Sequence, residues 1–292
     1  MRDATHITGV PPTDLLSFGD QVLAEERRRF NAANRDHRRF LITARLGVFA
    51  AALILWEVAS GTIIRHFFIA APSTVSVALY RWAVSGELWY HAQFTLTATF
   101  LGYLFGSLAG ILLAWPLGIM RTLYRITEPY FLVAYSVPAV AMGPVFILWF
   151  GLGMTPKVVL ASYFVFFIVF INTVTGFQQV PQGLLDVTRV MGASRIDTLR
   201  TVIFPNAIPY VLAALRITLP AAMIGAVVGE FIASNRGLGY LTRAAASRYS
   251  TAGVIAGVLV LGGIVLVMSL MLRPLRHALR WQDAVEVKGG AD

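Results

Sequence analysis

The sequence predicts an all-α membrane protein with six transmembrane helices and a polar loop between the fourth and the fifth. Hydrophobic residues make up 57% of the 292 residues and charged residues only 13%, where a soluble domain carries about 25%. Several apolar runs reach the ~18 residues that a span requires. They are too long and too uniform for the ~10-residue alternating strands of a membrane β-barrel.

Six apolar runs are the candidate spans: 46–64, 95–120, 130–150, 158–176, 209–233 and 251–272. The polar residues before them lack the apolar segment and cleavage site of a secretory signal, so we expect the first span to be retained. We therefore divide the chain into a basic tail 1–45, a six-helix transmembrane domain 46–273 with its core at 92–273, and a C-terminal tail 274–292.

The distribution of basic residues predicts the orientation. If both termini are cytoplasmic, the segments inside hold 17 Lys and Arg residues and the segments outside hold 6. This asymmetry follows the positive-inside rule and predicts a multi-pass membrane protein with both termini in the cytoplasm. The same rule accounts for the net charge of +9, so we expect no nucleic-acid partner. The outer loop 235–250, with three arginines, runs against the rule.

Catalytic and metal-binding chemistry finds little support in the sequence. The chain has no cysteine, and its five histidines are scattered. Its two lysines, Lys157 and Lys288, do not follow a glycine, so the phosphate-binding motif of an ATPase is absent. We expect a protein that is not an enzyme and that binds no metal or cofactor itself.

The polar loop 177–208 predicts two short amphipathic helices joined by a glycine turn at Gly192. Apolar residues recur at helical spacing on both sides of this glycine, and Asp186 with Arg189, like Asp197 with Arg200, is spaced for an ion pair. We expect Pro205 to end the second helix. Two interpretations stay open from these residues: a helix lying on the lipid headgroups, or a hairpin that docks on a cytoplasmic protein.

The third span contains SVPAVAMGP, in which Pro138 and Pro144 interrupt the helical hydrogen bonds. Unpaired carbonyls at membrane depth are tolerated mainly where they are buried or line a cavity. Tyr135, Ser136, Pro138 and Met142 are therefore candidates for a translocation pathway, and a simple kink is the alternative. Glu230, an acidic residue within the fifth span, is a candidate either for that pathway or for packing.

The polar loop resembles the "EAA" loop of binding-protein-dependent ABC importer permeases. Asp186, Val187 and Thr188 stand at the acid-Ala-Ala positions, and Gly192-Ala193 matches the Gly-Ala that follows. Further stretches resemble the nitrate, sulfonate and taurine branch of that family, and one resembles permeases for vitamin precursors. The stretches that resemble the nitrate, sulfonate and taurine branch are WEVAS, APSTV, SGELW, ILWFGLG, GASRIDTLRTVIFPNAIPYVLAALRI and GLGYL. The stretch that resembles the vitamin-precursor permeases is IGAVVGEFIAS.

This resemblance implies the fold of a type I importer permease that works by alternating access. The residues Asp186, Val187, Thr188, Arg189, Gly192, Ala193 and Ser194 would form a coupling helix and its turn. They would contact one of two cytoplasmic ABC ATPase subunits, which bind the ATP and magnesium. A second copy of the permease and a periplasmic or membrane-anchored binding protein would complete the complex, which moves a small anionic or heterocyclic solute through the lipid bilayer.

Two other classes of membrane protein fit the residues less well. An ion-coupled secondary transporter with an interfacial loop is the main alternative. That class often has a broken helix in each half of the chain, whereas this sequence shows one proline-broken span without a clear partner in the other half. An intramembrane enzyme lacks a catalytic constellation. Transport driven by an ion gradient in the isolated chain would distinguish the first alternative from an ATP-driven permease.

Overall fold

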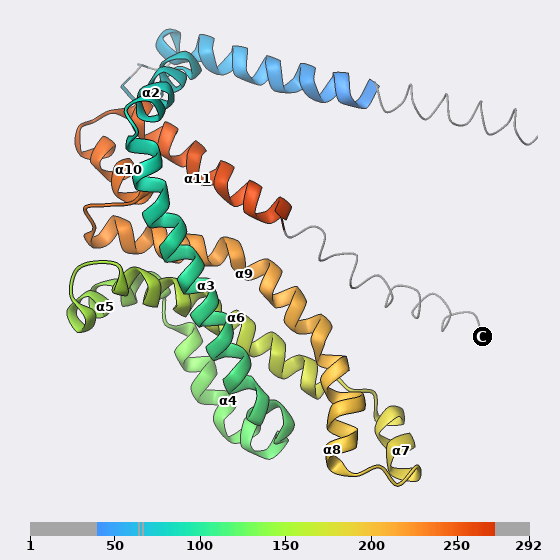
Figure 1. The fold of residues 1–292 in the computed structure, drawn as a ribbon. Helices are drawn as coiled ribbons and strands as arrows, with labels where there is room; N and C mark the ends of the chain where they lie inside the picture. The colour runs from blue at the N-terminus through green and yellow to red at the C-terminus, as the bar shows by residue number, and fades with distance from the viewer. Residues whose placement is uncertain (1–39, 64, 66, 272–292) are drawn as a thin grey trace, which may run out of the picture. The chain divides into compact units, whose positions relative to one another are not determined.

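The computed structural model describes residues 40–63, 65 and 67–271, and every regular element in these residues is a helix (Figure 1). The tail up to residue 39 and the predicted tail 274–292 lie outside them. The helices are Phe40–Thr62, α2 (Pro72–Val84), α3 (Glu87–Ile119), α4 (Arg121–Ser136), a 3₁₀ turn (Ala139–Ala141), α5 (Met142–Phe150), α6 (Thr155–Gln178), α7 (Gln182–Val190), α8 (Arg195–Thr198), a π-helical turn (Leu199–Ile203), α9 (Phe204–Ala233), α10 (Leu238–Ser247) and α11 (Thr251–Met271).

The chain divides at Arg65 into two units, and the first unit contributes one described helix, Phe40–Thr62. Leu46, Val48 and Phe49 on this helix are exposed. Its 23 residues are enough to cross a ~30 Å hydrocarbon layer at 1.5 Å per residue. The sequence placed this span at 46–64, so the helix begins six residues earlier than expected and ends two residues earlier.

The core of the second unit is the close packing of α3, α6 and α9. Ala161 of α6 lies between Gly102 of α3 and Gly225 of α9. A methyl group at Gly102 would come within 2.3 Å of the Ala161 Cβ, and one at Gly225 within 2.6 Å of its Cα. Small residues at these positions let the helix backbones approach in lipid, where dispersion contacts drive packing. This contact fixes the centre of the bundle.

The predicted third span, 130–150, is not one continuous helix. Helix α4 begins at Arg121, inside the expected loop 121–129, and breaks after Ser136. The second half, Ala139–Phe150, is bent from the first by 73°. Pro138 lies at this break, but Pro144 lies in the first turn of α5, where a missing N–H leaves no helical bond unmade. One of the two prolines therefore breaks the span.

Pro205 does not end the second helix of the polar loop, so this expectation from the sequence was wrong. Helix α8, the π-helical turn and α9 follow one another without a gap, which gives helical backbone from Arg195 to Ala233. In a π-helical turn each N–H bonds five residues back, so the wider turn alters the register just before the proline. The missing N–H of Pro205 then falls in the first turn of α9, where prolines are tolerated.

Helices α10 and α11 complete the end of the unit that also carries α2 (Figure 1). Gly257 of α11 packs directly on the Thr242 side chain of α10. The Thr251 hydroxyl donates a hydrogen bond to the carbonyl oxygen of Phe67, next to the start of α2. We call this the α10 end of the second unit and the opposite end of the same unit, with α7 and α8, the hairpin end.

The predicted number of spans agrees with the helices. Within residues 40–63 and 67–271, five helices are long and apolar enough to cross a membrane, and the bent pair of α4 with α5 gives a sixth when it is taken as one span. The all-α class and the six-span architecture are thereby confirmed. Two spans differ from the expectation. The third span is broken between α4 and α5, and the fifth span continues without a gap from the second half of the polar loop.

Candidate functional site

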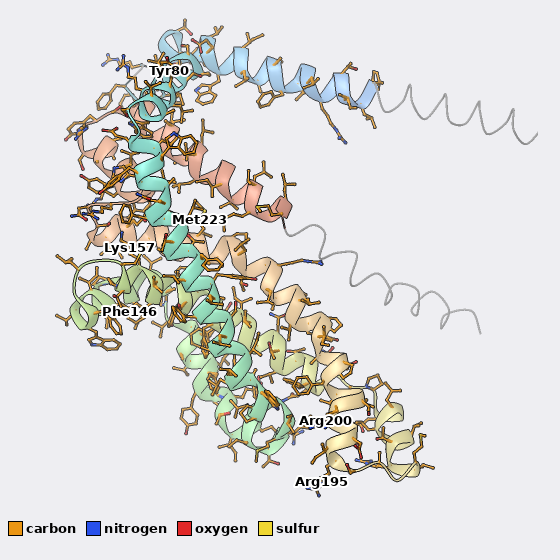
Figure 2. The ribbon with its side chains drawn as sticks, in the orientation of Figure 1. Tyr80, Phe146, Lys157, Arg195, Arg200 and Met223 are labelled. Atoms are coloured by element: carbon orange, nitrogen blue, oxygen red, sulfur yellow. The ribbon has the colours of Figure 1, made fainter. Side chains whose placement is uncertain are left out.

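The hairpin end is built by α7, a turn at Gly192, and α8. The ion pair expected in α7 forms, with Arg189 Nη1 3.0 Å from Asp186 Oδ1. Both side chains are mostly exposed, at 75% and 62%, so the pair adds little stability. Figure 2 shows Arg195 and Arg200 at this end of the molecule, well separated from Lys157 near the α10 end.

Gly192 makes the turn between the two helices with a φ of +70°. Its N–H donates to the carbonyl oxygen of Arg189, and the N–H of Ala193 donates to that of Thr188. These two bonds close the C-terminus of α7 in the manner of a glycine cap. A side chain at residue 192 would meet no neighbouring atom, so only the backbone conformation requires glycine here.

Ser194 starts α8 with a capping box. Its hydroxyl accepts a hydrogen bond from the N–H of Asp197 at 3.2 Å, and its own N–H donates to Asp197 Oδ2 at 3.2 Å. The Ser194 hydroxyl also donates to that oxygen at 2.6 Å. The expected partner of Asp197 was Arg200, and the structure instead turns the carboxylate back to Ser194, because the capping box satisfies two free backbone groups.

The hairpin carries large apolar side chains that no other part of the described chain covers. Val190 is 89% exposed and Met191 79%, and the others that share this property are Leu184, Val187 and Ile196. One polar face and one uncovered apolar face on a short helix are typical of a segment that packs on another surface. The residues predicted from the EAA resemblance lie on this hairpin; their contact with an ATPase stays a prediction.

The four other pathway candidates lie together at the bend between α4 and α5. Pro138 and Tyr135 are exposed, and Met142 is half-buried. The Ser136 hydroxyl donates to the carbonyl oxygen of Leu132, and the Tyr163 hydroxyl of α6 donates to that of Ala134. Side chains thus satisfy carbonyls next to the break. The structure groups these residues, and their role in transport stays a prediction.

Glu230 does not lie at that bend but in a buried polar cluster near the α10 end. Its side chain is fully buried, among residues of α3, α6 and α10. The Thr95 hydroxyl lies 3.0 Å from each of its two carboxylate oxygens, and the N–H of Gly239 donates to Oε2 at 2.8 Å. Lys157 Nζ lies 3.9 Å from Oε1. The carboxylate is thus hydrogen-bonded and has a cation nearby, as a buried charge requires.

The same cluster holds the short connection between α9 and α10 through its backbone. The N–H of Gly237 donates to His91 Nδ1 at 3.0 Å, and the N–H of Leu238 donates to the Thr95 hydroxyl at 2.8 Å. Lys157 Nζ donates to the carbonyl oxygen of Arg236 at 3.0 Å. Side chains from α3 and α6 therefore fix a connection that follows them by some 80 to 146 residues.

The geometry of Gly237 explains the glycine in the GLG stretch. Its φ is +111°, and a methyl group there would lie 2.0 Å from Glu230 Oε1. Gly239 is also tight, with 2.9 Å to the Glu230 Cβ. Glu230 and the GLGYL stretch stood out separately in the sequence, but their partners Thr95, His91 and Lys157 did not. The one available signal for Lys157 was its position directly before an apolar span, in a chain with two lysines.

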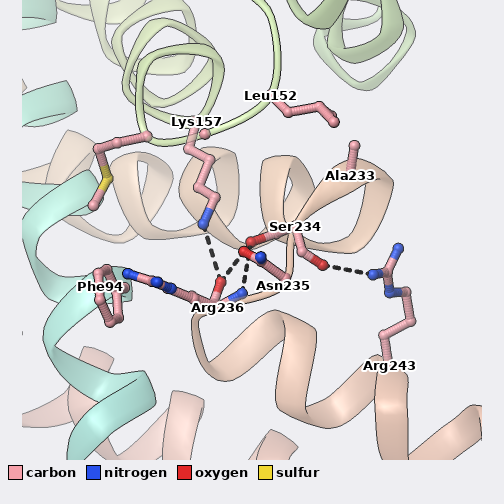
Figure 3. A pocket seen from close by; sticks show the side chains of 10 residues that line it. Phe94, Leu152, Lys157, Ala233, Ser234, Asn235, Arg236 and Arg243 are labelled. Carbon is pink, nitrogen blue, oxygen red and sulfur yellow. Dashed lines mark hydrogen bonds between the residues drawn. The ribbon is translucent and has the colours of Figure 1, made fainter.

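A cavity of about 600 Å³ lies beside this cluster (Figure 3). It opens between the turn before α6 and the connection from α9 to α10. Its ten lining residues are Phe94, Leu152, Gly153, Met154, Lys157, Ala233, Ser234, Asn235, Arg236 and Arg243. Arg243 donates to the carbonyl oxygens of Phe231 at 3.0 Å and Ser234 at 2.7 Å, and so closes the C-terminus of α9. In the described part of the chain no three His, Cys, Asp or Glu residues gather to hold a metal ion.

A bundle of apolar helices long enough to cross a membrane, with one broken span, defines a helical membrane protein. The sequence from 106 to 281 matches the family model described as binding-protein-dependent transport system inner membrane component, and the chain belongs to this family of ABC importer permeases. The nitrate, sulfonate and taurine branch expected from the sequence is supported by the named relatives.

Individual relatives align over most of their length. A probable ABC transporter permease protein of Haemophilus influenzae is 33% identical, over 78% of this chain and 93% of the relative. The taurine transport system permease protein TauC of Escherichia coli is 31% identical, over 84% and 92%. The riboflavin transport system permease protein RibX of Chloroflexus aurantiacus is 32% identical, over 74% and 81%.

Solved structures share the fold. An amino acid ABC transporter crystallised with histidines superposes with a TM-score of 0.52 at 21% identity, covering 66% of this chain and 92% of that one. The inward-facing MetNI methionine ABC transporter superposes with a TM-score of 0.51 at 21% identity, covering 66% and 96%. At this identity the similarity concerns the fold.

Proposed function

We propose that the chain is the membrane permease subunit of an ATP-driven importer for a small anionic or heterocyclic solute. Family membership and the fold support the permease role. The observation that carries the proposal further is the hairpin of α7, Gly192 and α8, because its apolar side chains are built into a capped, well-defined shape and yet left uncovered. A rigid exposed hairpin suits docking on a partner.

In this proposal the hairpin end faces the cytoplasm, as do both chain termini, and the α10 end faces outward. Asp186, Val187, Thr188, Arg189, Gly192, Ala193 and Ser194 contact one of two ABC ATPase subunits. Those subunits bind and hydrolyse the ATP, with its magnesium ion. A second permease copy in the lipid bilayer and a periplasmic or membrane-anchored binding protein complete the assembly. The basic distribution in the sequence supports this orientation.

The movement proposed is alternating access. Closure of the ATPase subunits displaces α7 and α8, and the helical connection of α8 with α9 carries this displacement into the span. The bend at Tyr135, Ser136, Pro138 and Met142 is the proposed pathway wall. Glu230 contributes from within its cluster, by holding the connection between α9 and α10 in place, rather than by contact with the solute.

Val190→Asp tests the docking surface. Val190 is 89% exposed, so the change leaves the fold intact while it places a charge on the apolar face that the ATPase would cover. We expect the chain in lipid nanodiscs to lose co-purification with the ATPase subunit of its own transport system. Val84→Asp is the matched control, an exposed valine (69%) at the end of α2, and it should leave the complex intact.

The energy source is tested separately. The purified chain alone should neither bind nor hydrolyse ATP, and reconstitution with the ATPase subunit and ATP should produce uptake into proteoliposomes. Uptake by the chain alone under an ion gradient would contradict the proposal and favour a secondary transporter. Equal loss of complex in Val190→Asp and Val84→Asp would remove the hairpin as the docking site.

A further inference from the structure

The charged residues that line the cavity beside the polar cluster are all positive. None of its ten described lining residues is acidic, and three of them, Lys157, Arg236 and Arg243, are cations. The neighbouring carboxylate, Glu230, is fully buried, and the Thr95 hydroxyl and the Gly239 N–H hydrogen-bond to it. One of the three positive charges is thereby balanced, and two remain. A cavity with an excess of cations and low-dielectric walls concentrates anions.

The three cations differ in how much of their hydrogen-bonding capacity is used. Arg243 is engaged with the carbonyl oxygens at the end of α9. Lys157 gives one N–H to the carbonyl oxygen of Arg236. The Arg236 guanidinium lies over the rings of Phe94 and Tyr90, at 5.2 and 6.0 Å, and donates to no acceptor among the described residues. Its planar set of donors is held in place by the rings and stays available.

The remaining wall adds size and polarity. Phe94, Leu152 and Met154 supply apolar surface, and Ser234 and Asn235 supply neutral polar groups. Helix α6 begins beside the cavity without a side-chain cap, so the positive end of a 24-residue helix is directed to the same region. A volume of about 600 Å³ lies within the usual range for small-molecule sites, about 300–1,000 Å³.

We propose that this cavity binds a small organic anion, with the anionic head on Arg236 and Lys157 and an apolar body against Phe94, Leu152 and Met154. The ligand class is an organic sulfonate or carboxylate. This inference rests on the proposed function, since it makes the cavity a binding site for the imported solute at the α10 end of the permease. It also narrows the choice between anionic and heterocyclic solutes.

The experiment uses the full chain in phosphatidylcholine nanodiscs and a matched pair of fluorinated probes. 4-Fluorobenzenesulfonate carries the charge, and 4-fluorobenzenesulfonamide has nearly the same shape without it. Titrations followed by ¹⁹F NMR should show the sulfonate binding at least about tenfold more tightly, as expected for hydrogen bonds to a charged group. Equal affinity of the two probes would overturn the inference.

Variants locate the site. Arg236→Gln should weaken sulfonate binding at least about tenfold, and Arg236→Lys should restore part of it because the charge returns without the planar donors. Asn235→Asp, at an exposed position of the lining, adds a negative charge and should also weaken binding. Arg248→Gln is the control, an exposed arginine at the C-terminal end of α10 and outside the lining, and should change affinity less than about twofold. Equal effects of Arg236→Gln and Arg248→Gln would overturn the assignment.

Two further measurements distinguish a solute from a lipid in the cavity, and failure of the anion site from failure of the permease function. Nanodiscs containing phosphatidylglycerol test whether lipid phosphates fill the cavity: undiminished probe binding supports the solute, and displacement of the probe by the anionic lipid overturns it. Co-purification with the ATPase subunit is measured on the same samples. A chain that forms the complex and supports ATP hydrolysis but binds no sulfonate would refute the anion site alone and leave the permease function standing.

Discussion

The Thr95 hydroxyl lies 3.0 Å from both carboxylate oxygens of Glu230, although 135 residues separate the two in the sequence. This contact joins α3 to α9 by polar groups, farther along the helices than the point where Gly102 and Gly225 pack on Ala161 of α6. Because Leu238 donates its N–H to the same hydroxyl, the link extends to the start of α10. A buried network of this kind is costly to disturb in part.

Removal of the Glu230 carboxylate should strongly destabilise the chain. Glu230→Ala leaves the buried Lys157 ammonium without its counter-charge and the Gly239 N–H without its acceptor, and breaking a buried pair costs about 3–5 kcal/mol. We expect a marked fall in the free energy of unfolding in detergent titrations. Glu87→Ala, at an exposed acid of α3, is the control and should change it by less than about 0.5 kcal/mol.

The pairing of Lys157 with Glu230 can be isolated by a double-mutant cycle. Glu230→Gln combined with Lys157→Met removes both charges, so the double variant should lose less stability than the two single variants together. Additive losses would show that the 3.9 Å approach contributes no energetic coupling.

Gly237→Ala should be far more damaging than Gly86→Ala. Both glycines have positive φ, +111° and +79°, so both substitutions strain the backbone. A methyl group at Gly86 meets nothing within 4 Å, whereas at Gly237 it lies 2.0 Å from Glu230 Oε1. We expect about 1–2 kcal/mol for Gly86→Ala and clearly more for Gly237→Ala in thermal unfolding. Similar losses of stability in the two variants would mean that the residues around Glu230 accommodate the added methyl group without a loss of stability.

Gly192→Ala should impair coupling, while Gly183→Ala should not. Both positions lie on the hairpin end, and an added methyl group at either one meets no atom. Gly192 has a φ of +70°, where a side chain costs about 1–2 kcal/mol, and Gly183 is helical, where alanine is preferred. In the reconstituted complex, uptake per ATP hydrolysed should fall for Gly192→Ala. Equal ratios in both variants and the native chain would contradict the role of the turn.

Gly102→Ala should separate helices that Gly262→Ala leaves untouched. At Gly102 a methyl group would lie 2.3 Å from the Ala161 Cβ, and at Gly262 of α11 it meets nothing within 4 Å. We expect Gly102→Ala to lower the unfolding temperature. Gly262→Ala should hold or raise it, because alanine stabilises a helix relative to glycine by up to about 1 kcal/mol. A higher unfolding temperature in Gly102→Ala would show that α3 and α6 can move apart freely.

The sequence was most informative where the structure is set by neighbours along the chain. Apolar spacing around Gly192 predicted the two helices of the hairpin, because helix periodicity and glycine conformation are local properties. The Asp186–Arg189 pair followed from the same spacing. The Asp197–Arg200 pair did not, since the capping box of Ser194 gives the Asp197 carboxylate a closer partner.

Prolines were harder to interpret, because their effect depends on the turn around them. Pro138 breaks its span, Pro144 sits in a first turn, and Pro205 follows a π-helical turn that residue periodicity does not reveal. The polar cluster was beyond prediction for another reason. His91, Thr95 and Lys157 meet Glu230 and Gly237 only after three helices have packed, and no local pattern encodes that meeting.

The helical backbone from Arg195 to Ala233 has a consequence for how the two ends of the molecule communicate. Its 39 residues correspond to about 58 Å at 1.5 Å per residue. It begins at the Ser194 cap and ends next to Ser234 and the cation-lined cavity. The hairpin and the wall of the cavity therefore lie at the two ends of one helical segment. The π-helical turn Leu199–Ile203, near the N-terminal end of this segment, is a position where it can bend.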